Sequence, residues 1–312
     1  MYSIQVLFKL NDSFLMTRAF FLMTPCFFFL YVNVVMLFTL RSKEIFCETP
    51  RYILFSHLLT SDSLLVATSV TFYIFYSTTL DEASLYILSY VCLLIYLLSG
   101  ILNAISPLYL ALMSLERYIA ICFPLRHAAI LATPGRTRLA IPLVWAAGCV
   151  NVLTDVCVLF LGEPAFYLAP TVCTIEQLLV APWQGTKALA LNTLLFVSVA
   201  ILILYTYVAI LVEARSASSD KASTHKALKT VLLHAFQLGL SLMSFVYVFL
   251  ESLASQLPVA VYVQLRFLNF FVVLILPRCL SSLVYGLRDE AFKPLFKQHF
   301  FFCGSFTKVG PQ

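Results

Sequence analysis

The chain has 312 residues, of which 61% are hydrophobic, 15% aromatic and only 11% charged. A soluble domain is about half apolar and about one quarter charged, so this chain cannot cover its surface with polar groups, and a cytosolic enzyme is excluded. Disorder is excluded too, because disordered chains combine low hydrophobicity with high net charge, whereas the net charge here is only +5. The nine cysteines are too sparse for a small disulfide scaffold and show no zinc-like spacing.

Seven stretches of the chain are apolar over about 20 residues, which is the length that crosses a bilayer as a helix. They are residues 19–40, 52–77, 85–116, 139–161, 188–212, 227–250 and 261–286. We therefore predict an all-α membrane protein, a bundle of seven transmembrane helices. It forms one domain over residues 1–312, with an N-terminal segment 1–18, a bundle 19–286 and a tail 287–312. The first span is too long for the apolar part of a cleaved signal peptide.

Lysines and arginines are distributed unevenly between the two sides of this bundle. Most of them lie in the loops after spans one, three and five and in the tail. The opposite side holds Lys9, Arg18, Lys187 and Arg266. Positive charge collects on the cytoplasmic side of membrane proteins, so we expect the N-terminus outside the cell and the tail inside. A glycosylation sequon at Asn11 agrees with this orientation, although such triplets also arise by chance.

The tail contains an apolar pattern with helical spacing. Its members are Phe292, Leu295, Phe296, His299 and Phe300, with charged residues between them. That pattern predicts a short amphipathic helix along the inner membrane surface, with membrane lipids as its partner.

A charged triplet, Glu116-Arg117-Tyr118, stands at the inner end of the third span. Charged side chains near a span are costly and usually mark function, and adjacent Glu and Arg can form an ion pair that is held or released. Simple positive-inside anchoring is the alternative interpretation. The triplet belongs to a run, 113–125, in which Pro124 is a helix stop signal.

With this run in place, the sequence resembles a rhodopsin-like G-protein-coupled receptor, and more narrowly an odorant receptor of the kind found in fish. The segment 49–62, which ends in Asp62, and the segment 226–230 are similar to odorant-receptor signatures. The number of residues from Cys92 to Arg117 also matches the family. Further matching positions are Asn33, Trp145, Tyr207, His234 and the run 276–289.

The resemblance implies a heterotrimeric G protein as partner, of the stimulatory olfactory type that raises cyclic AMP. The switch that activates this G protein would lie at the inner face of the bundle. Its residues would be Glu116, Arg117, Tyr118, Leu125, Tyr207 and Tyr285. It also implies a disulfide between Cys92 and Cys173, with two free buried thiols as the alternative. The protein would lie in the plasma membrane, in the cilia of olfactory neurons. We expect no cofactor, no metal and no nucleic acid.

By the same resemblance, a small odorant binds in the outer half of the bundle, among apolar walls with a few polar groups. The candidate lining residues are Tyr96, Ser99, Asn103, Asn192, Leu242, Glu251, Gln264 and Asn269. Each of them taken singly could instead pack against a neighbouring helix. Ser99 stands where amine receptors carry an aspartate, which argues against an amine ligand. Asp155 and Glu251 are weaker candidates for reading a cationic group.

Two features of the seventh span depart from the family pattern. Ser281 and Ser282 replace an Asn-Pro pair, which removes a source of kinking and predicts a straighter span. Arg278 lies within the membrane and cannot shed its proton, so it needs a partner. By the same resemblance, which places these two positions close together, we expect Arg278 to pair with Asp62, near Ser106, where many relatives hold a sodium ion. Bonding of Arg278 to backbone carbonyls or water is the alternative. The resulting internal polar core is Asn33, Asp62, Ser106, Arg278 and Ser281.

Other functions fit the sequence less well. The chain contains no metalloprotease, phosphate-loop or nucleophile-elbow motif, so we expect no enzyme. A small membrane transporter would show internal repeats and broken, glycine-rich helices, whereas the chain has only nine glycines and an odd number of spans. A non-olfactory receptor for a lipid or peptide is the remaining alternative on the same scaffold.

Overall fold

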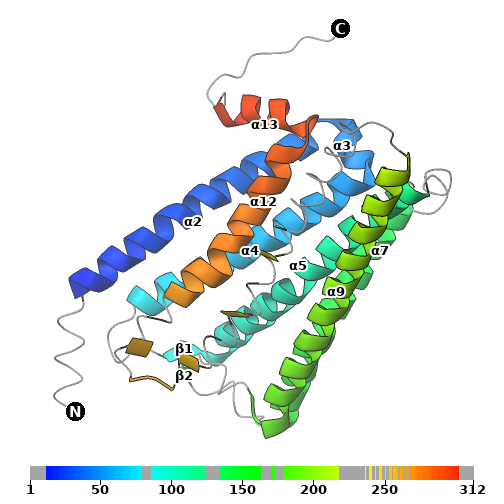
Figure 1. Ribbon diagram of the computed structural model, residues 1–312. Coiled ribbons are helices and arrows are strands. Elements are labelled where there is room, and N and C mark those ends of the chain that lie inside the picture. The colour runs from blue at the N-terminus through cyan, green and yellow to red at the C-terminus, as the bar shows by residue number, and fades with distance from the viewer. Residues whose placement is uncertain are drawn as a thin grey trace.

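The structure is a computed structural model that describes most of the bundle (Figure 1). The described residues are 12–78, 86–123, 134–162, 170–172, 179–217 and 268–301, with single residues and short runs between 236 and 265. All statements below concern these residues. Most of the sixth predicted span, 227–250, lies outside them. The predictions made for Asn11, Leu125, Cys173, Leu242, Glu251 and Gln264 also concern residues outside them.

Five long helices correspond to the first five predicted spans. They are α2 (Asp12–Arg41), α4 (Pro50–Thr78), α5 (Ser89–Cys122), α7 (Pro134–Gly162) and α9 (Pro182–Ala217). Each is long and apolar enough to cross a membrane. The helices extend beyond most of the predicted limits, because a helix continues past the bilayer where its backbone bonds can still form. α5 is the exception at its N-terminus, since it begins at Ser89 and not at residue 85.

The residues before α5 form a strand, which the sequence analysis did not predict. β1 (Tyr86–Leu88) pairs antiparallel with β2 (Pro170–Val172), with Tyr86 opposite Val172. This small ladder lies at the same end of the bundle as the start of α2 (Figure 1). It brings the chain that follows α7 beside the beginning of α5.

The seventh span is not a continuous α-helix, and the irregular part lies upstream of Ser281 and Ser282. A π-helical turn, η2 (Phe270–Ile275), precedes α12 (Leu276–Arg288). Pro277 has no amide hydrogen, and its ring crowds the carbonyl four residues earlier. The preceding turn is wider, and the Leu276 amide bonds the Phe271 carbonyl, five residues back.

Two short helices lie at the opposite end of the bundle from the strands (Figure 1). α3 (Glu44–Glu48) falls in the first basic loop, and α13 (Phe292–Phe301) is the predicted amphipathic tail helix. Phe292 and Phe296 are buried, and Phe292 contacts the rings of Phe46 and Phe55. The apolar face of α13 therefore packs against α2, α3 and α4 of the protein itself.

α5 is the central helix and packs against α4, α7 and α9. The contact with α7 depends on a missing side chain. A Cβ atom at Gly148 would lie 2.5 Å from Ile105 Cγ2, so only glycine fits without a shift. Small residues at helix interfaces allow this close approach in membrane proteins.

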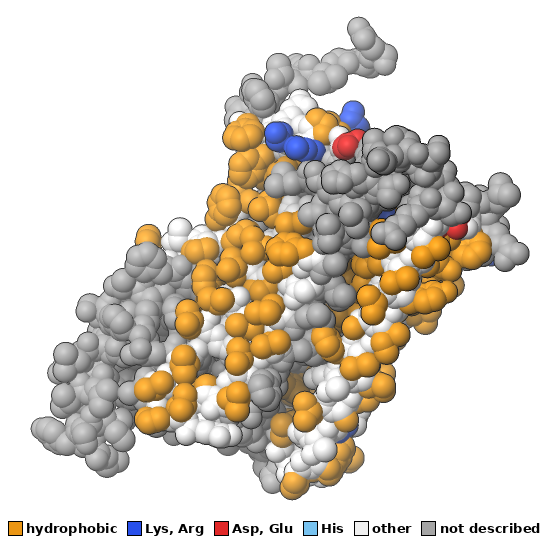
Figure 2. All heavy atoms as spheres, in the orientation of Figure 1, with side chains coloured by type: hydrophobic (Ala, Val, Ile, Leu, Met, Phe, Trp, Pro, Cys, Tyr) orange, Lys and Arg blue, Asp and Glu red, His pale blue; other side chains and the backbone are white. Residues whose placement is uncertain are grey.

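The outer surface of the long helices is largely apolar (Figure 2). Large aliphatic side chains such as Leu139, Leu143, Leu194 and Leu204 are about two-thirds exposed, at 66 to 67%. In water such a surface would drive association, whereas in a bilayer it faces lipid. In the view of Figure 2, charged side chains gather mainly toward the end that carries α13 and α3.

Candidate functional site

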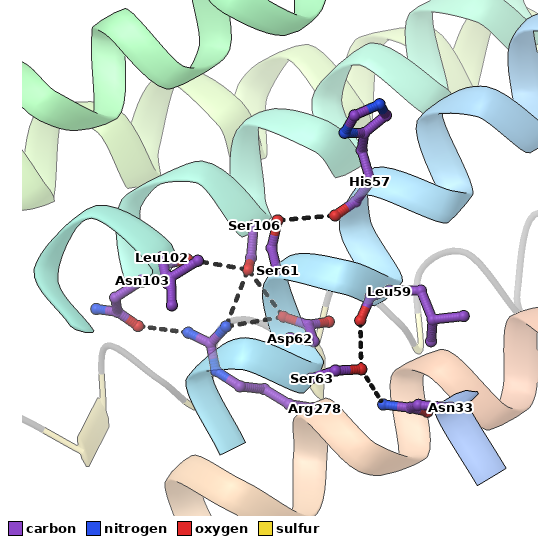
Figure 3. A network of polar contacts seen from close by, with 10 residues as sticks. All are labelled: Asn33, His57, Leu59, Ser61, Asp62, Ser63, Leu102, Asn103, Ser106 and Arg278. Carbon is purple, nitrogen blue, oxygen red and sulfur yellow. Dashed lines mark hydrogen bonds and ion pairs between the residues drawn. The ribbon is translucent and has the colours of Figure 1, made fainter. Parts of the chain in front are cut away.

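A buried ion pair joins the second and seventh spans near the middle of the bundle (Figure 3). Arg278 Nη1 of α12 lies 3.0 Å from Asp62 Oδ1 of α4. Both side chains are only 5% exposed. The structure thus places in contact the two residues that the sequence analysis paired.

The third span completes this network. Ser106 of α5 donates to Asp62 Oδ1 at 2.8 Å and accepts from Arg278 Nη1 at 3.0 Å. Arg278 Nη2 donates to the Asn103 amide oxygen, one turn away on the same helix. One guanidinium therefore bonds three side chains on two neighbouring helices, which its planar fork of donors allows. The opposite charges are matched, and both terminal nitrogens of the guanidinium donate hydrogen bonds, which favours a buried pair.

Asn33 and Ser281, the other predicted members of the polar core, are placed differently. Asn33 of α2 donates to the Ser63 hydroxyl at 3.0 Å, and Ser63 donates to the Leu59 carbonyl at 2.6 Å (Figure 3). Asn33 therefore fixes α2 against α4 without a hydrogen bond to Asp62. Ser281 lies in α12, but its side chain lies outside the described residues.

The predicted switch residues that the structure describes lie toward the end of the bundle that carries α13. Glu116 is buried, and its Oε2 lies 3.5 Å from Arg117 Nε. This is an ion contact at the long end of the range. The Tyr118 ring packs edge-on against Tyr205 of α9, and Tyr207 is buried in the main core. Tyr285 lies in α12, with its side chain outside the described residues.

Several pocket candidates have intramolecular partners. The Asn103 oxygen accepts from Arg278, and the Tyr96 hydroxyl donates to Asp155 Oδ2 at 3.2 Å. Asn269 is buried and donates to the Tyr247 carbonyl at 3.1 Å. Ser99 and Asn192 are half-buried. The first three residues thus fit the alternative of helix-to-helix bonding, which was open for each of them.

Asp155 also has a partner that the sequence analysis did not identify. Lys187 Nζ lies 2.6 Å from Asp155 Oδ1. The sequence placed Lys187 in a loop just before span five, but α9 begins at Pro182 and carries Lys187 in its second turn. The spacing Gln184–Lys187 on one helix face was the available signal. Asp155 is therefore already neutralised and does not stand free to read a cationic ligand.

A third cluster holds the tail helix, and sequence reasoning missed it. Asp289 Oδ2 lies 2.9 Å from Arg51 Nη2, and its Oδ1 accepts from the Tyr52 hydroxyl at 2.9 Å. The same Oδ1 accepts the amides of Ala291 and Phe292 at 3.0 Å each. An aspartate that accepts the first amides of a helix acts as an N-cap, and this signal was present in the sequence before the tail pattern.

These observations define a class of membrane protein, a bundle of apolar helices held by buried polar contacts, with a Glu–Arg pair at one end of its central helix. Residues 32–285 match the family model for the 7 transmembrane receptor (rhodopsin family). The chain belongs to this family. Five of the seven predicted spans are described as long helices, and the sixth and seventh are described only in part. A family with seven transmembrane spans accounts for these two as well.

Individual relatives narrow the class. Over 280 residues the chain is 36% identical to "Odorant receptor 131-2" of Danio rerio, covering 89% of this chain and 84% of that protein. It is 28% identical to the human "Olfactory receptor 2W1" over 220 residues, 67% of this chain and 65% of that one. It is 24% identical to the human "Olfactory receptor 51E1" over 279 residues, 83% and 80% of the two chains. The chain is a member of the odorant-receptor family, which consists of receptors and not enzymes.

Proposed function

We propose that this protein binds a small, water-soluble odorant in the outer half of its bundle and activates a heterotrimeric G protein at the inner end. The G protein is of the stimulatory olfactory type, which raises cyclic AMP. The receptor lies in the plasma membrane of ciliated sensory neurons, with its N-terminus outside. Membership in the odorant-receptor family carries this proposal, and the relatives named above favour it over a lipid or peptide receptor.

The arrangement of charge supports the proposed orientation. Arg41, Lys43, Lys293 and Lys297 are exposed and lie in or beside α2, α3 and α13, at the end opposite β1 and β2 (Figure 1). Basic residues at one end of a bundle favour a cytoplasmic position. Epitope tags at the two termini test this directly. Tags accessible from the same side of the membrane would contradict the topology.

The Glu116–Arg117 contact supports the proposed switch. A ligand shifts a two-state equilibrium only by its difference in affinity for the two states, so the contact that distinguishes the states must be easy to release. The pair is 3.5 Å apart, and the Arg117 side chain is 26% exposed. The contact is thus long and reached by solvent at Arg117, whereas the Glu116 side chain is buried. Such a contact can separate at its solvent-facing side when the bundle changes its arrangement.

The Asp62 network does not fit a bound sodium ion, which many relatives hold at this aspartate. Arg278 already contacts Asp62, Ser106 and Asn103, and its fixed positive charge would oppose a second cation at the same oxygens. Arg278 serves instead as a permanent internal cation. This chain therefore signals without regard to the sodium concentration.

A cyclic AMP reporter assay in cells tests the function. A panel of water-soluble odorants (amino acids, bile acids, amines and prostaglandins) identifies an agonist. Arg117→Ala then abolishes the response while surface expression is retained, because the inner switch is lost. Arg138→Ala is the matched control, since Arg138 is an exposed arginine in the first turns of α7, at the same end of the bundle as Arg117. Undiminished signalling by Arg117→Ala at matched expression, or ionic current without a G protein, would contradict the proposal.

A further inference from the structure

The carboxylate of Asp155 is surrounded by donors from two other helices. Its Oδ1 accepts from Lys187 Nζ at 2.6 Å and from Gln184 Nε2 at 3.0 Å. Its Oδ2 accepts from the Tyr96 hydroxyl at 3.2 Å. Asp155 is 2% exposed and Gln184 is fully buried. This is a built polar site between α5, α7 and α9, separate from the Arg278 network and from the Glu116–Arg117 pair.

Lys187 is held in this site as an ammonium ligand would be. An ammonium group has three donors. Nζ donates to Asp155 Oδ1 and, at 3.0 Å, to the Asn151 carbonyl, and it lies 5.8 Å from the centroid of the Trp183 ring. A carboxylate, a carbonyl and an aromatic face are the three kinds of group that bind cations of this type.

The sequence builds the site from two helix faces. Asn151 and Asp155 are four residues apart on α7, and Gln184 and Lys187 are three apart on α9, so each pair shares one face. Gln184 is itself fixed, because its Oε1 accepts the Ala181 amide at 2.7 Å where α9 begins. The acceptors are thus positioned by the backbone and not only by the lysine.

We propose that Lys187 is a tethered ligand in a primary-ammonium site formed by Asp155, Asn151 and Trp183, and that it is thereby a specificity-determining residue that excludes amines from this wall of the bundle. The exclusion rests on the proposed odorant-binding function, whereas the site itself does not. A free alkylammonium enters only when the lysine side chain is removed. The odorant of the unaltered receptor is consequently not an amine bound by Asp155.

The test is to replace the tethered ammonium by a free one. Lys187→Ala removes three methylene groups and the ammonium, so n-propylammonium has the shape and charge of the missing atoms. In the purified full-length receptor in detergent, Lys187→Ala lowers the melting temperature. Adding n-propylammonium raises it in proportion to the logarithm of concentration above Kd, as for any ligand of the folded state. Propanol and propionate have no such effect.

Two variants control for unspecific stabilisation. Lys187→Met fills the space without a charge, so n-propylammonium does not stabilise it. Asp155→Asn combined with Lys187→Ala keeps the space but removes the counter-ion, so rescue is lost there too. An equal shift in these variants or in the unaltered receptor would overturn the site, as would the absence of a shift in Lys187→Ala.

If Lys187→Ala is too unstable to purify, the same rescue is measured as surface expression of cells grown with n-propylammonium, and no gain there counts against the site. These readouts need neither an odorant nor a G protein. Their failure would contradict the ammonium site and leave the receptor function intact. A receptor that gave no cyclic AMP response would contradict the proposed function and leave the ammonium site intact.

Discussion

Asp62 and Asp155 are both buried carboxylates of this bundle, and each is neutralised in a different way. Asp62 meets Arg278, whose guanidinium also bonds Ser106 and Asn103, and the Arg278 side chain is 5% exposed. Asp155 meets Lys187, a point charge whose side chain is 17% exposed. A planar fork with several partners fixes direction, whereas an ammonium fixes mainly charge. The first pair therefore determines how three helices meet, and the second can tolerate replacement of its cation.

Arg278→Ala gives the largest expected loss. It leaves Asp62 buried without its cation, which costs about 3 to 5 kcal/mol. We expect little receptor at the cell surface and a large fall in melting temperature. Combining Arg278→Ala with Asp62→Asn recovers part of the loss, because no charge is then left unpaired. A single variant with normal expression and signalling would show that the pair does not support the fold.

Lys187→Met gives a smaller loss, which sharpens the contrast between the pairs. The variant removes the counter-ion of Asp155, but this carboxylate keeps the donors Gln184 and Tyr96, whereas Asp62 keeps Ser106 in Arg278→Ala. We expect a loss of about 1 to 3 kcal/mol in the free energy of unfolding, measured by thermal or denaturant unfolding in detergent. A loss equal to that of Arg278→Ala would remove the distinction between the two pairs.

Asp289→Ala extends the comparison to the partly exposed pair at the tail helix. It removes the N-cap of α13 and the partner of Arg51, and loss of a cap costs about 1 kcal/mol. We expect faster hydrogen exchange of the α13 amides with the transmembrane helices unchanged. Lys297→Ala, on the exposed face of the same helix, is the control. Equal exchange in both variants would show that Asp289 does not hold the helix.

Tyr96→Phe gives the smallest expected effect. It removes one hydrogen bond to Asp155 and keeps the ring in place, a loss of about 0.5 to 1.5 kcal/mol. A double-mutant cycle with Asp155→Asn measures the coupling between the two side chains. Additive losses would indicate that the 3.2 Å contact contributes nothing.

The spans and the need of Arg278 for a partner could be predicted because each follows from a strong local cost, whereas the choice of Asp62 as that partner came from the family resemblance. Twenty apolar residues have few alternatives to a membrane helix, and a buried guanidinium must find an acceptor. Lys187 could not be assigned in the same way, because a lysine near a span end is equally consistent with an interfacial anchor. Only the helix start at Pro182, six residues before the predicted limit, turns it toward Asp155.

The sequence could not predict the two strands, nor the partners of Tyr96 and Asn103. A three-residue strand has no periodicity to detect. A polar side chain on a span is compatible with a ligand or with a neighbouring helix, and the choice depends on how the helices are rotated. The disulfide between Cys92 and Cys173 stays a prediction, because Cys173 lies outside the described residues.

The π-helical turn η2 sets the rotational phase of everything after it in the seventh span. Each residue of a regular helix advances the side-chain direction by about 100°, so one residue more or fewer between Phe270 and Ile275 turns Arg278 by about that angle. Deleting one residue there would turn the guanidinium away from Asp62, although both side chains would still be present. The contact between Arg278 and Asp62 therefore depends on the number of residues in η2 as well as on the chemistry of the two groups.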